Sequence, residues 1–89
     1  MKVKFSKEFI KKYKKANVRI RNRVDEQILL FENNPNESSL RHHSLHNEWL
    51  GYKSIDITDD YRAIYEEVET EKDVSAYFID LGTHKELYG

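Results

Sequence analysis

Residues 52–81 read YKSIDITDDYRAIYEEVETEKDVSAYFIDL, and this stretch decides the fold. Polar and apolar side chains alternate within it with a period of two, which is typical of β-strands. Two clusters of turn-forming residues, at 58–60 and 70–73, divide it into three segments. The pattern therefore predicts three consecutive strands, over residues 52–57, 61–67 and 74–81. The last is apolar enough to be central.

The residues before this stretch predict a short strand and two helices. Residues 2–5 alternate polar and apolar, and Ser6 is placed to cap the first helix, which ends near Ala16 and Asn17. A second helix is predicted from apolar residues that repeat every three or four positions, at Ile20, Val24, Ile28 and Phe31. It ends at residues 33–36, because Pro35 disfavours helical geometry in the residue before it.

The order of elements is β-α-α-β-β-β within a single domain, residues 1–89. This predicts an α+β fold in which two helices pack on one face of a mostly antiparallel four-stranded sheet. Residues 36–48 are expected to form a loop, Gly82 to end the last strand, and residues 83–89 to form a short tail. The expected core comprises Ile20, Val24, Ile28, Phe31, Ile64 and Phe78.

Composition excludes several classes of protein. The chain has no cysteine, so it can form neither a disulfide framework nor a thiolate metal site. No apolar run approaches the roughly 20 residues that span a bilayer, and the N-terminus lacks the apolar segment of a signal peptide. The three glycines form no phosphate-binding loop. We therefore expect a soluble cytoplasmic protein without a cofactor.

Charge is distributed unevenly along the chain. Residues 1–24 hold ten Lys or Arg and one Glu, whereas residues 25–89 hold five basic and fifteen acidic residues. The segments thus carry about +9 and −10, and such asymmetry favours a polyanion as partner of the basic part. The candidate contacts are Lys11, Lys12, Lys14 and Lys15. The alternative is a lysine-rich helix face that is merely solvated.

Three of the four histidines lie in one loop, which raises the question of a metal site. His42, His43 and His46 form the pattern His-His-x-x-His, which is not the helical His-Glu-x-x-His arrangement of zinc enzymes. Structural zinc sites also usually include sulfur ligands. We therefore expect no metal.

A second constellation suits RNA cleavage without a metal. That reaction needs a base for the ribose 2′-hydroxyl, an acid for the leaving 5′-oxygen, and a cation for the phosphate. Histidine can serve as base or acid near neutral pH, and an aromatic ring can hold a base by stacking. The candidate catalytic residues are His43, Asp60, His84 and Tyr88, and the candidate substrate-binding residues are Lys53, Tyr61 and Arg62.

Each of these residues also has a purely structural interpretation. Arg62 can be the cross-strand partner of an acid, Asp60 a turn residue, and Tyr61 part of the core. The residue pattern alone does not choose between the two interpretations.

The motifs in the C-terminal half resemble those of the RelE/ParE toxin superfamily, and most closely its YafQ-like branch. They are His-x-Leu at residues 43–45, Trp-x-Gly at 49–51, Asp-Tyr-Arg-x-Ile-Tyr at 60–65 and Gly-Thr-His-x-x-Leu-Tyr at 82–88. Together they cover about half of the chain, and their combination in this order is specific, although no single motif is. The N-terminal strand and helical hairpin agree with the family's order of elements.

The resemblance implies a toxin that enters the ribosomal A site and cuts mRNA there. His43 falls on the histidine of the family's His-Pro-Leu motif, Asp60 and Tyr61 on its Asp-Trp pair, His84 on the histidine of Gly-Thr-His, and Tyr88 on its terminal aromatic residue. Asp56 departs from the pattern, since YafQ-like enzymes tend to have histidine there. An acid cannot replace a histidine as proton donor at neutral pH without a strongly raised pKa. This implies rearranged machinery or weaker activity.

The implied partners are an antitoxin protein, in a heteromeric toxin–antitoxin complex, together with the ribosome and mRNA. In this scheme His84 is the general acid, His43 or Asp60 is the base, Arg62 with Lys53 stabilises the phosphate, and Tyr61 or Tyr88 holds the nucleotide. Two alternatives remain: a ParE-like inhibitor of DNA gyrase, and a degenerate toxin that only binds its antitoxin.

Overall fold

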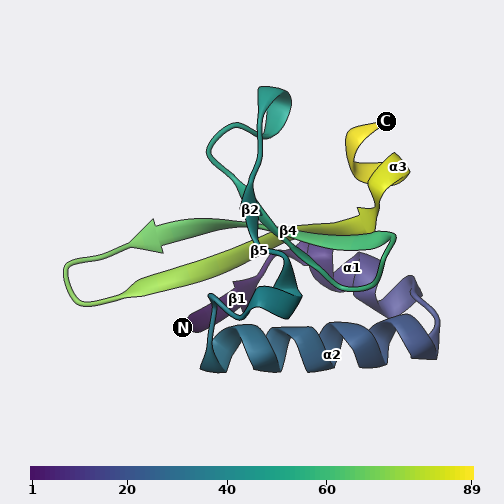
Figure 1. Ribbon diagram of the computed structural model, residues 1–89, viewed down its shortest axis with the longest axis horizontal. Helices are drawn as coiled ribbons and strands as arrows, with labels where there is room; N and C mark the ends of the chain where they lie inside the picture. The colour runs from purple at the N-terminus through teal and green to yellow at the C-terminus, as the bar shows by residue number, and fades with distance from the viewer.

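A five-stranded sheet forms the centre of the computed structural model, which describes residues 1–89 (Figure 1). The strand order is β1-β5-β4-β3-β2. The pairing of β1 with β5 is parallel and the other three pairings are antiparallel. The strands are β1 (Lys2–Phe5), β2 (His43–Ser44), β3 (Lys53–Asp56), β4 (Tyr61–Glu69) and β5 (Val74–Thr83), and the helices are α1 (Lys7–Lys15), α2 (Val18–Asn33) and α3 (His84–Tyr88). The predicted α+β class is confirmed.

Side-chain caps define where the two long helices begin. The Ser6 hydroxyl accepts a hydrogen bond from the Phe9 N–H at 3.0 Å, as the sequence predicted. The Asn17 side chain accepts from the Ile20 N–H at 2.9 Å, so the break between the helices is also the cap of α2. The chain therefore turns at residues 16–17 into a helical hairpin.

The helical hairpin covers one face of the sheet, as predicted. All six expected core residues are buried. Five of them pack in the main core with residues of β3, β4 and β5, but Ile64 belongs to a second cluster with Leu45 and Leu87. This second cluster lies on the opposite face, because Ile64 alternates along β4 with the core residues Ala63 and Tyr65.

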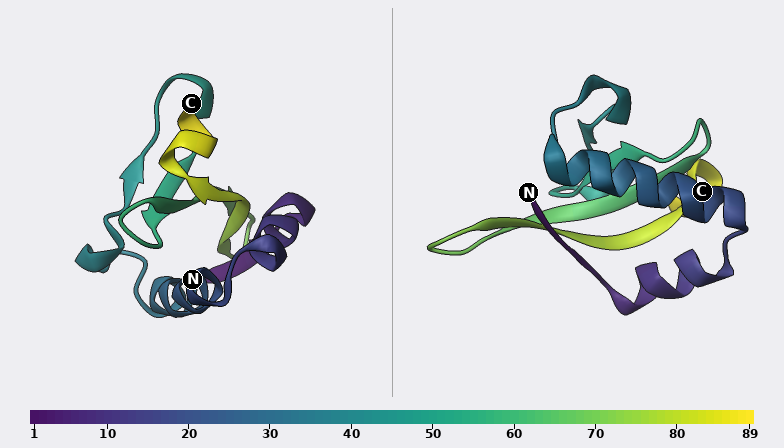
Figure 2. Two further views of the ribbon diagram at one scale, coloured as in Figure 1. Left: turned by 90° about the vertical axis from the view of Figure 1, so that its right-hand side faces the viewer. Right: turned by 90° about the horizontal axis from the view of Figure 1, so that it is seen from below.

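The face of the sheet away from the helices carries two smaller features. Residues 45–52, which follow β2 and are called the β2 excursion below, lie on this side together with the C-terminal helix α3, across the sheet from α2 (Figures 1 and 2). The indole N–H of Trp49 in the excursion donates to the Leu87 carbonyl of α3 at 3.2 Å. Residues from the middle and the end of the chain are therefore held together on one side of the molecule.

The predicted count of four strands was wrong, because the loop expected at residues 36–48 contains β2. This strand has only two residues, which pair with Ser54 and Lys53 through the backbone. Both of its residues are exposed. No hydrophobic period therefore marks it in the sequence.

The predicted end of the chain was also wrong. Gly82 does not end β5 but pairs with Arg62 inside it, and residues 84–88 form α3 rather than an irregular tail. A Cβ atom at residue 82 would lie 3.3 Å from the Glu86 Cβ, so the glycine allows α3 to fold back closely over its own strand. Five residues are too few for a hydrophobic period to reveal the helix.

None of the helices combines the length and the apolar character that crossing a membrane requires.

Candidate active site

A hollow of about 470 Å³ lies on the face of the sheet that the helical hairpin leaves free. Its walls come from the β2 excursion, from β4 and from α3. The lining residues are His43, Ser44, Leu45, His46, Asn47, Arg62, His84 and Tyr88. Three of the four predicted catalytic residues and one predicted substrate-binding residue therefore meet in one place.

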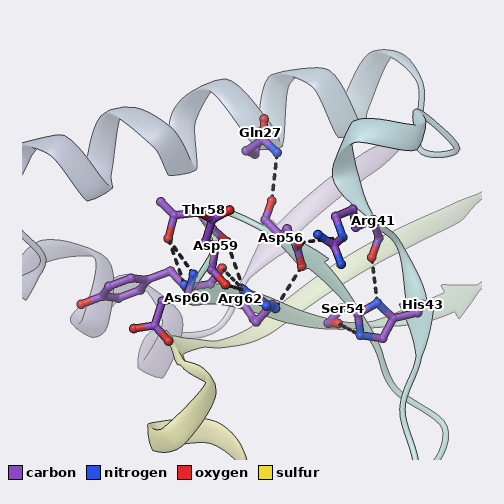
Figure 3. Close-up of polar contacts among 10 residues, drawn as sticks. Gln27, Arg41, His43, Ser54, Asp56, Thr58, Asp59, Asp60 and Arg62 are labelled. Carbon is purple, nitrogen blue, oxygen red and sulfur yellow. Dashed lines mark hydrogen bonds and ion pairs between the residues drawn. The ribbon is translucent and has the colours of Figure 1, made fainter.

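His43 is held at both ring nitrogens. Its Nδ1 lies 2.7 Å from the Arg41 carbonyl oxygen, and its Nε2 lies 3.2 Å from the Ser54 hydroxyl (Figure 3). A carbonyl can only accept a hydrogen bond, so neutral His43 carries its hydrogen on Nδ1. The lone pair is then on Nε2, where Ser54 donates to it. This tautomer makes Nε2 the basic atom of the side chain.

His84 is the first residue of α3, and its position is fixed by the helix start. Its backbone N–H donates to the Asp60 carbonyl at 3.0 Å. Thr83 and Glu86 form a reciprocal capping box around it, with bonds of 3.1 and 2.8 Å. These bonds to Thr83 lower the pKa of the Glu86 carboxyl below its usual value. The imidazole of His84 is exposed and free to act on a bound molecule.

Arg62 and Asp56 form an ion pair beside the hollow. They stand opposite each other in the β3–β4 ladder, so their side chains share a face, and Arg62 Nε lies 3.0 Å from Asp56 Oδ1. The Arg62 Nη1 also donates to the carbonyl oxygens of the β3–β4 turn, at Thr58, Asp59 and Tyr61 (Figure 3). The guanidinium is thus fixed on two sides.

Tyr88 closes the hollow from α3. Its ring packs edge-on against His84, with ring centroids 4.8 Å apart. Its hydroxyl is buried and has no hydrogen-bond partner within the protein. Tyr88 and His84 therefore form one aromatic wall, in which a donor is left unused.

Three predicted site residues lie outside this hollow. The Asp60 side chain is exposed in the β3–β4 turn, and only its backbone carbonyl meets His84. Lys53 is an alternate residue to Ser54 on β3, so it lies on the other face, where its Nζ pairs with Glu67 at 2.7 Å. Tyr61 also faces the helical hairpin, where it lies against the main core.

The four predicted RNA-binding lysines do not form one cluster. Lys11, Lys12 and Lys15 line a second hollow, of about 330 Å³, together with Tyr61 and two acidic residues, Glu8 and Glu86. Within this group Lys12 forms an ion pair with Asp80. Lys14 points to the other side of α1, into an apolar groove between α1 and α2.

Sequence reasoning missed several residues of the site. Ser54 is not among the predicted site residues, and Asp56 enters the prediction only as a departure from the family pattern. Both share a strand face with Arg62, and the alternation along residues 52–57 carried that signal. Arg41 contacts both His43 and Asp56, but it lies in an irregular turn with a left-handed backbone (φ 49°), which no residue pattern predicts. His46 lines the hollow although it falls on no motif of the resemblance.

His42 is excluded from the site by its contacts. Its Nε2 hydrogen-bonds the Tyr65 hydroxyl, and its ring stacks on that tyrosine. Burial and the nearby Lys53 ammonium lower the pKa of His42, and burial raises the pKa of Tyr65. No group of three or more His, Asp or Glu residues is arranged to hold a metal ion.

The hollow therefore combines two imidazoles, a fixed guanidinium and an aromatic wall. Such a set can take a proton, give a proton and stabilise an anion between the two. These are the groups that the resemblance implied, apart from Asp60, Lys53 and Tyr61.

Comparison with known proteins identifies the family and the fold. A family model described as "Bacterial toxin of type II toxin-antitoxin system, YafQ" matches residues 1–89. YafQ from E. coli strain BL21(DE3) is 28% identical over 98% of this chain and 97% of that chain, with a TM-score of 0.77. A chain of the E. coli DinJ–YafQ toxin–antitoxin complex is 27% identical over 98% of this chain and 96% of that chain, with a TM-score of 0.73.

A more distant structure shows the same fold. The YoeB/ParE toxin from Agrobacterium tumefaciens is 18% identical over 94% of this chain and 99% of that chain, with a TM-score of 0.75. No curated protein matches the chain. The resemblance seen in the motifs is confirmed by the family match over the whole length: the chain belongs to the YafQ family of bacterial toxins of type II toxin–antitoxin systems.

Proposed function

We propose that this toxin is a ribosome-dependent endoribonuclease that cuts mRNA in the A site, with no metal in the chemical step. The observation that carries the proposal is the meeting of His43, Arg62, His84 and Tyr88 in one hollow. They supply the base, the cation, the acid and the aromatic surface that cleavage by a 2′-hydroxyl needs. A protein that only binds gyrase or an antitoxin does not need this combination.

His43 is the proposed general base. Its Nδ1–H is committed to the Arg41 carbonyl, which leaves the Nε2 lone pair for a proton. The ribose 2′-hydroxyl replaces Ser54 as the donor to Nε2 and gives up its proton as its oxygen attacks phosphorus. Asp60, the other candidate base, does not line the hollow.

His84 is the proposed general acid. As the 2′-oxygen–phosphorus bond forms, the bond from phosphorus to the 5′-oxygen breaks, and protonated His84 gives that oxygen its proton. Arg62 stabilises the charge on the non-bridging phosphate oxygens. The Tyr88 ring stacks on the nucleotide. The products are a 2′,3′-cyclic phosphate and a 5′-hydroxyl end.

Ribosomal RNA is the proposed ligand of the second hollow. Lys11 and Lys15 form no ion pair, although Glu8 and Glu86 also line the hollow, and Tyr61 adds an aromatic surface beside them. Cations and a flat ring are the groups that bind nucleic-acid backbone and bases without sequence preference. Tyr61 and the lysines would then hold the toxin on the ribosome rather than contact the scissile phosphate.

An antitoxin is the proposed protein partner, and the complex is heteromeric and cytoplasmic. Two of the related structures are toxin–antitoxin complexes, DinJ–YafQ from E. coli and RelBE2 from Mycobacterium tuberculosis. This chain leaves Phe5, Ile10 and Leu29 exposed around an apolar groove of about 530 Å³ between α1 and α2. An amphipathic antitoxin segment would cover such a surface.

Three parallel assays test the proposal. The toxin is added to programmed ribosomes with labelled mRNA, to a gyrase supercoiling reaction, and to an affinity column that recovers its genomic neighbour. Cleavage only on the ribosome, with gyrase unaffected, is expected. Gyrase inhibition without cleavage would replace the proposal with a ParE-like function. Tight binding of the neighbour with neither activity would indicate a degenerate toxin.

A further inference from the structure

Asp56 is a buried carboxylate that two arginines share. Its side chain is 11% exposed, its Oδ1 lies 3.0 Å from Arg62 Nε, and its Oδ2 lies 3.4 Å from Arg41 Nε. The two guanidiniums approach it from different elements, β4 and the turn before β2 (Figure 3). Its backbone carbonyl accepts from the buried Gln27 side chain of α2 at 2.9 Å, which fixes this part of β3. Two cations and one anion leave a net positive charge at this point.

The two arginines keep unused donors. Arg62 pairs with Asp56 through Nε by charge alone, because Asp56 Oδ1 accepts no hydrogen bond. Its Nη1 donates to three backbone carbonyls, and its Nη2 has no partner within the protein. Arg41 pairs with Asp56 through Nε alone, and its side chain is 76% exposed. The Nη groups of Arg41 are therefore open to a ligand, although the shared carboxylate restrains the side chain.

Arg41 is also coupled to the proposed base. Its carbonyl holds the Nδ1–H of His43, and its side chain reaches Asp56. The residue that makes both contacts has a left-handed backbone, which is uncommon for a residue other than glycine. A single turn therefore places a cation and orients a base on the same side of the sheet.

We propose that Arg41 is a second phosphate-binding residue, and that Asp56 is a positioning residue that holds Arg41 and Arg62 as a pair. The ligand is a phosphodiester of the RNA substrate, so this inference rests on the proposed function. One carboxylate between two guanidiniums restrains both and leaves one net positive charge for the phosphate oxygens. Asp56 thus does not take over proton transfer from the histidine that related enzymes tend to have there.

A pair of glutamine variants tests the role of Arg41. The probe is a programmed ribosome whose mRNA carries a 2′-deoxynucleotide at the cut position, so that the toxin binds without cutting. Arg41→Gln should weaken binding about tenfold. It should also lower the slope of log affinity against log salt by roughly 0.7, as expected for one lost phosphate contact to a single strand.

Arg23→Gln is the matched control, because Arg23 makes an exposed ion pair with Glu26 on α2, at 2.7 Å. It should bind as the parent does. Equal affinities and salt slopes for Arg41→Gln and Arg23→Gln would overturn the inference. If the parent itself neither binds the probe nor cuts ribosome-bound mRNA, the proposed function fails and the inference fails with it.

Variants of Asp56 separate positioning from proton donation. Asp56→Asn should weaken binding of the uncleavable probe. Adding Arg41→Gln to Asp56→Asn should weaken binding less than Arg41→Gln does in the parent, because Asp56 no longer positions Arg41. Asp56→His should not restore cleavage. Parent-like binding by Asp56→Asn, with cleavage lost and then restored by Asp56→His, would show proton donation and overturn the inference. Thermal unfolding of each variant verifies that it is folded. If Asp56→Asn does not fold, binding by Arg41→Gln decides whether the inference stands.

Discussion

The backbone N–H of His84 donates to the carbonyl oxygen of Asp60 over 3.0 Å. This bond joins the start of α3 to the β3–β4 turn, and it satisfies one of the N–H groups that a helix start leaves free. Asp60 therefore meets the site through its main chain, whereas its carboxylate is exposed. The position matches a family motif, yet in this structure it is the main chain of Asp60, not its side chain, that contacts His84.

Substitution of Asp60 and His43 should therefore have unequal effects. Asp60→Ala keeps the carbonyl that positions His84, so we expect cleavage within a few-fold of the parent. His43→Ala removes the proposed base and should slow single-turnover cleavage by about 10²–10⁴-fold. The measurement is the rate on programmed ribosomes at saturating toxin. A large loss in Asp60→Ala with a small one in His43→Ala would reverse the assignment.

The lysines of α1 should differ according to their side of the helix. Lys11→Gln and Lys15→Gln should weaken ribosome binding and reduce its salt dependence, because each removes a cation beside Tyr61. Lys14→Gln, on the groove side, is the matched control and should have little effect. Sedimentation with ribosomes over a range of salt concentrations measures this. Equal behaviour of all three variants would indicate that these lysines form a solvated helix face and do not bind ribosomal RNA.

Tyr88→Phe should make the free toxin more stable. The hydroxyl is buried without a partner, so its removal should raise the free energy of unfolding by about 1 kcal/mol. Cleavage should stay close to the parent rate, because we propose that the ring rather than the hydroxyl holds the nucleotide. Tyr88→Ala should be slow. Denaturant unfolding and single-turnover rates check both parts, and a slow Tyr88→Phe enzyme would identify the hydroxyl as the acid in place of His84.

Stability should fall in mild acid because of His42. Burial and Lys53 lower its pKa in the folded protein below the ordinary value of 6.5. The unfolded chain therefore takes up a proton that the folded protein does not, so stability is full above pH 6.5 and declines between there and the lowered pKa. His42→Gln removes this contribution and should flatten the decline. Urea unfolding at pH 7.5, 6.5 and 5.5 measures it, and identical pH slopes for parent and variant would contradict the account.

Periodicity predicted the elements that have enough residues to show it. The apolar repeat from Ile20 to Phe31 and the alternation in β3 to β5 are long, and the caps at Ser6 and Asn17 mark the helix starts. The two-residue strand β2 and the five-residue α3 have no period. They form because backbone groups find partners across the sheet and because Thr83 caps the last helix.

The sequence predicted the candidate site residues that fall on family motifs. It did not predict the contacts that depend on the pairing register of neighbouring strands. His43, His84 and Tyr88 fall on family motifs, and they do line one hollow. The link of Asp56 to Arg62 depends on the β3–β4 register, and the link of Arg41 to Asp56 depends on a left-handed turn. Alternation assigns a residue to a strand face, but it does not say which residue of the next strand stands opposite.

We propose that the hollow of His43, Arg62, His84 and Tyr88 cuts RNA through the ribose 2′-hydroxyl. The most direct measurement compares two ribosome-bound mRNAs that differ only by a 2′-deoxynucleotide at the cut position. The toxin is first treated with EDTA and desalted. We expect the all-ribose mRNA to be cut to a product ending in a 2′,3′-cyclic phosphate, and the deoxy-substituted mRNA to stay intact. Cleavage of the deoxy-substituted mRNA at the same position would contradict it.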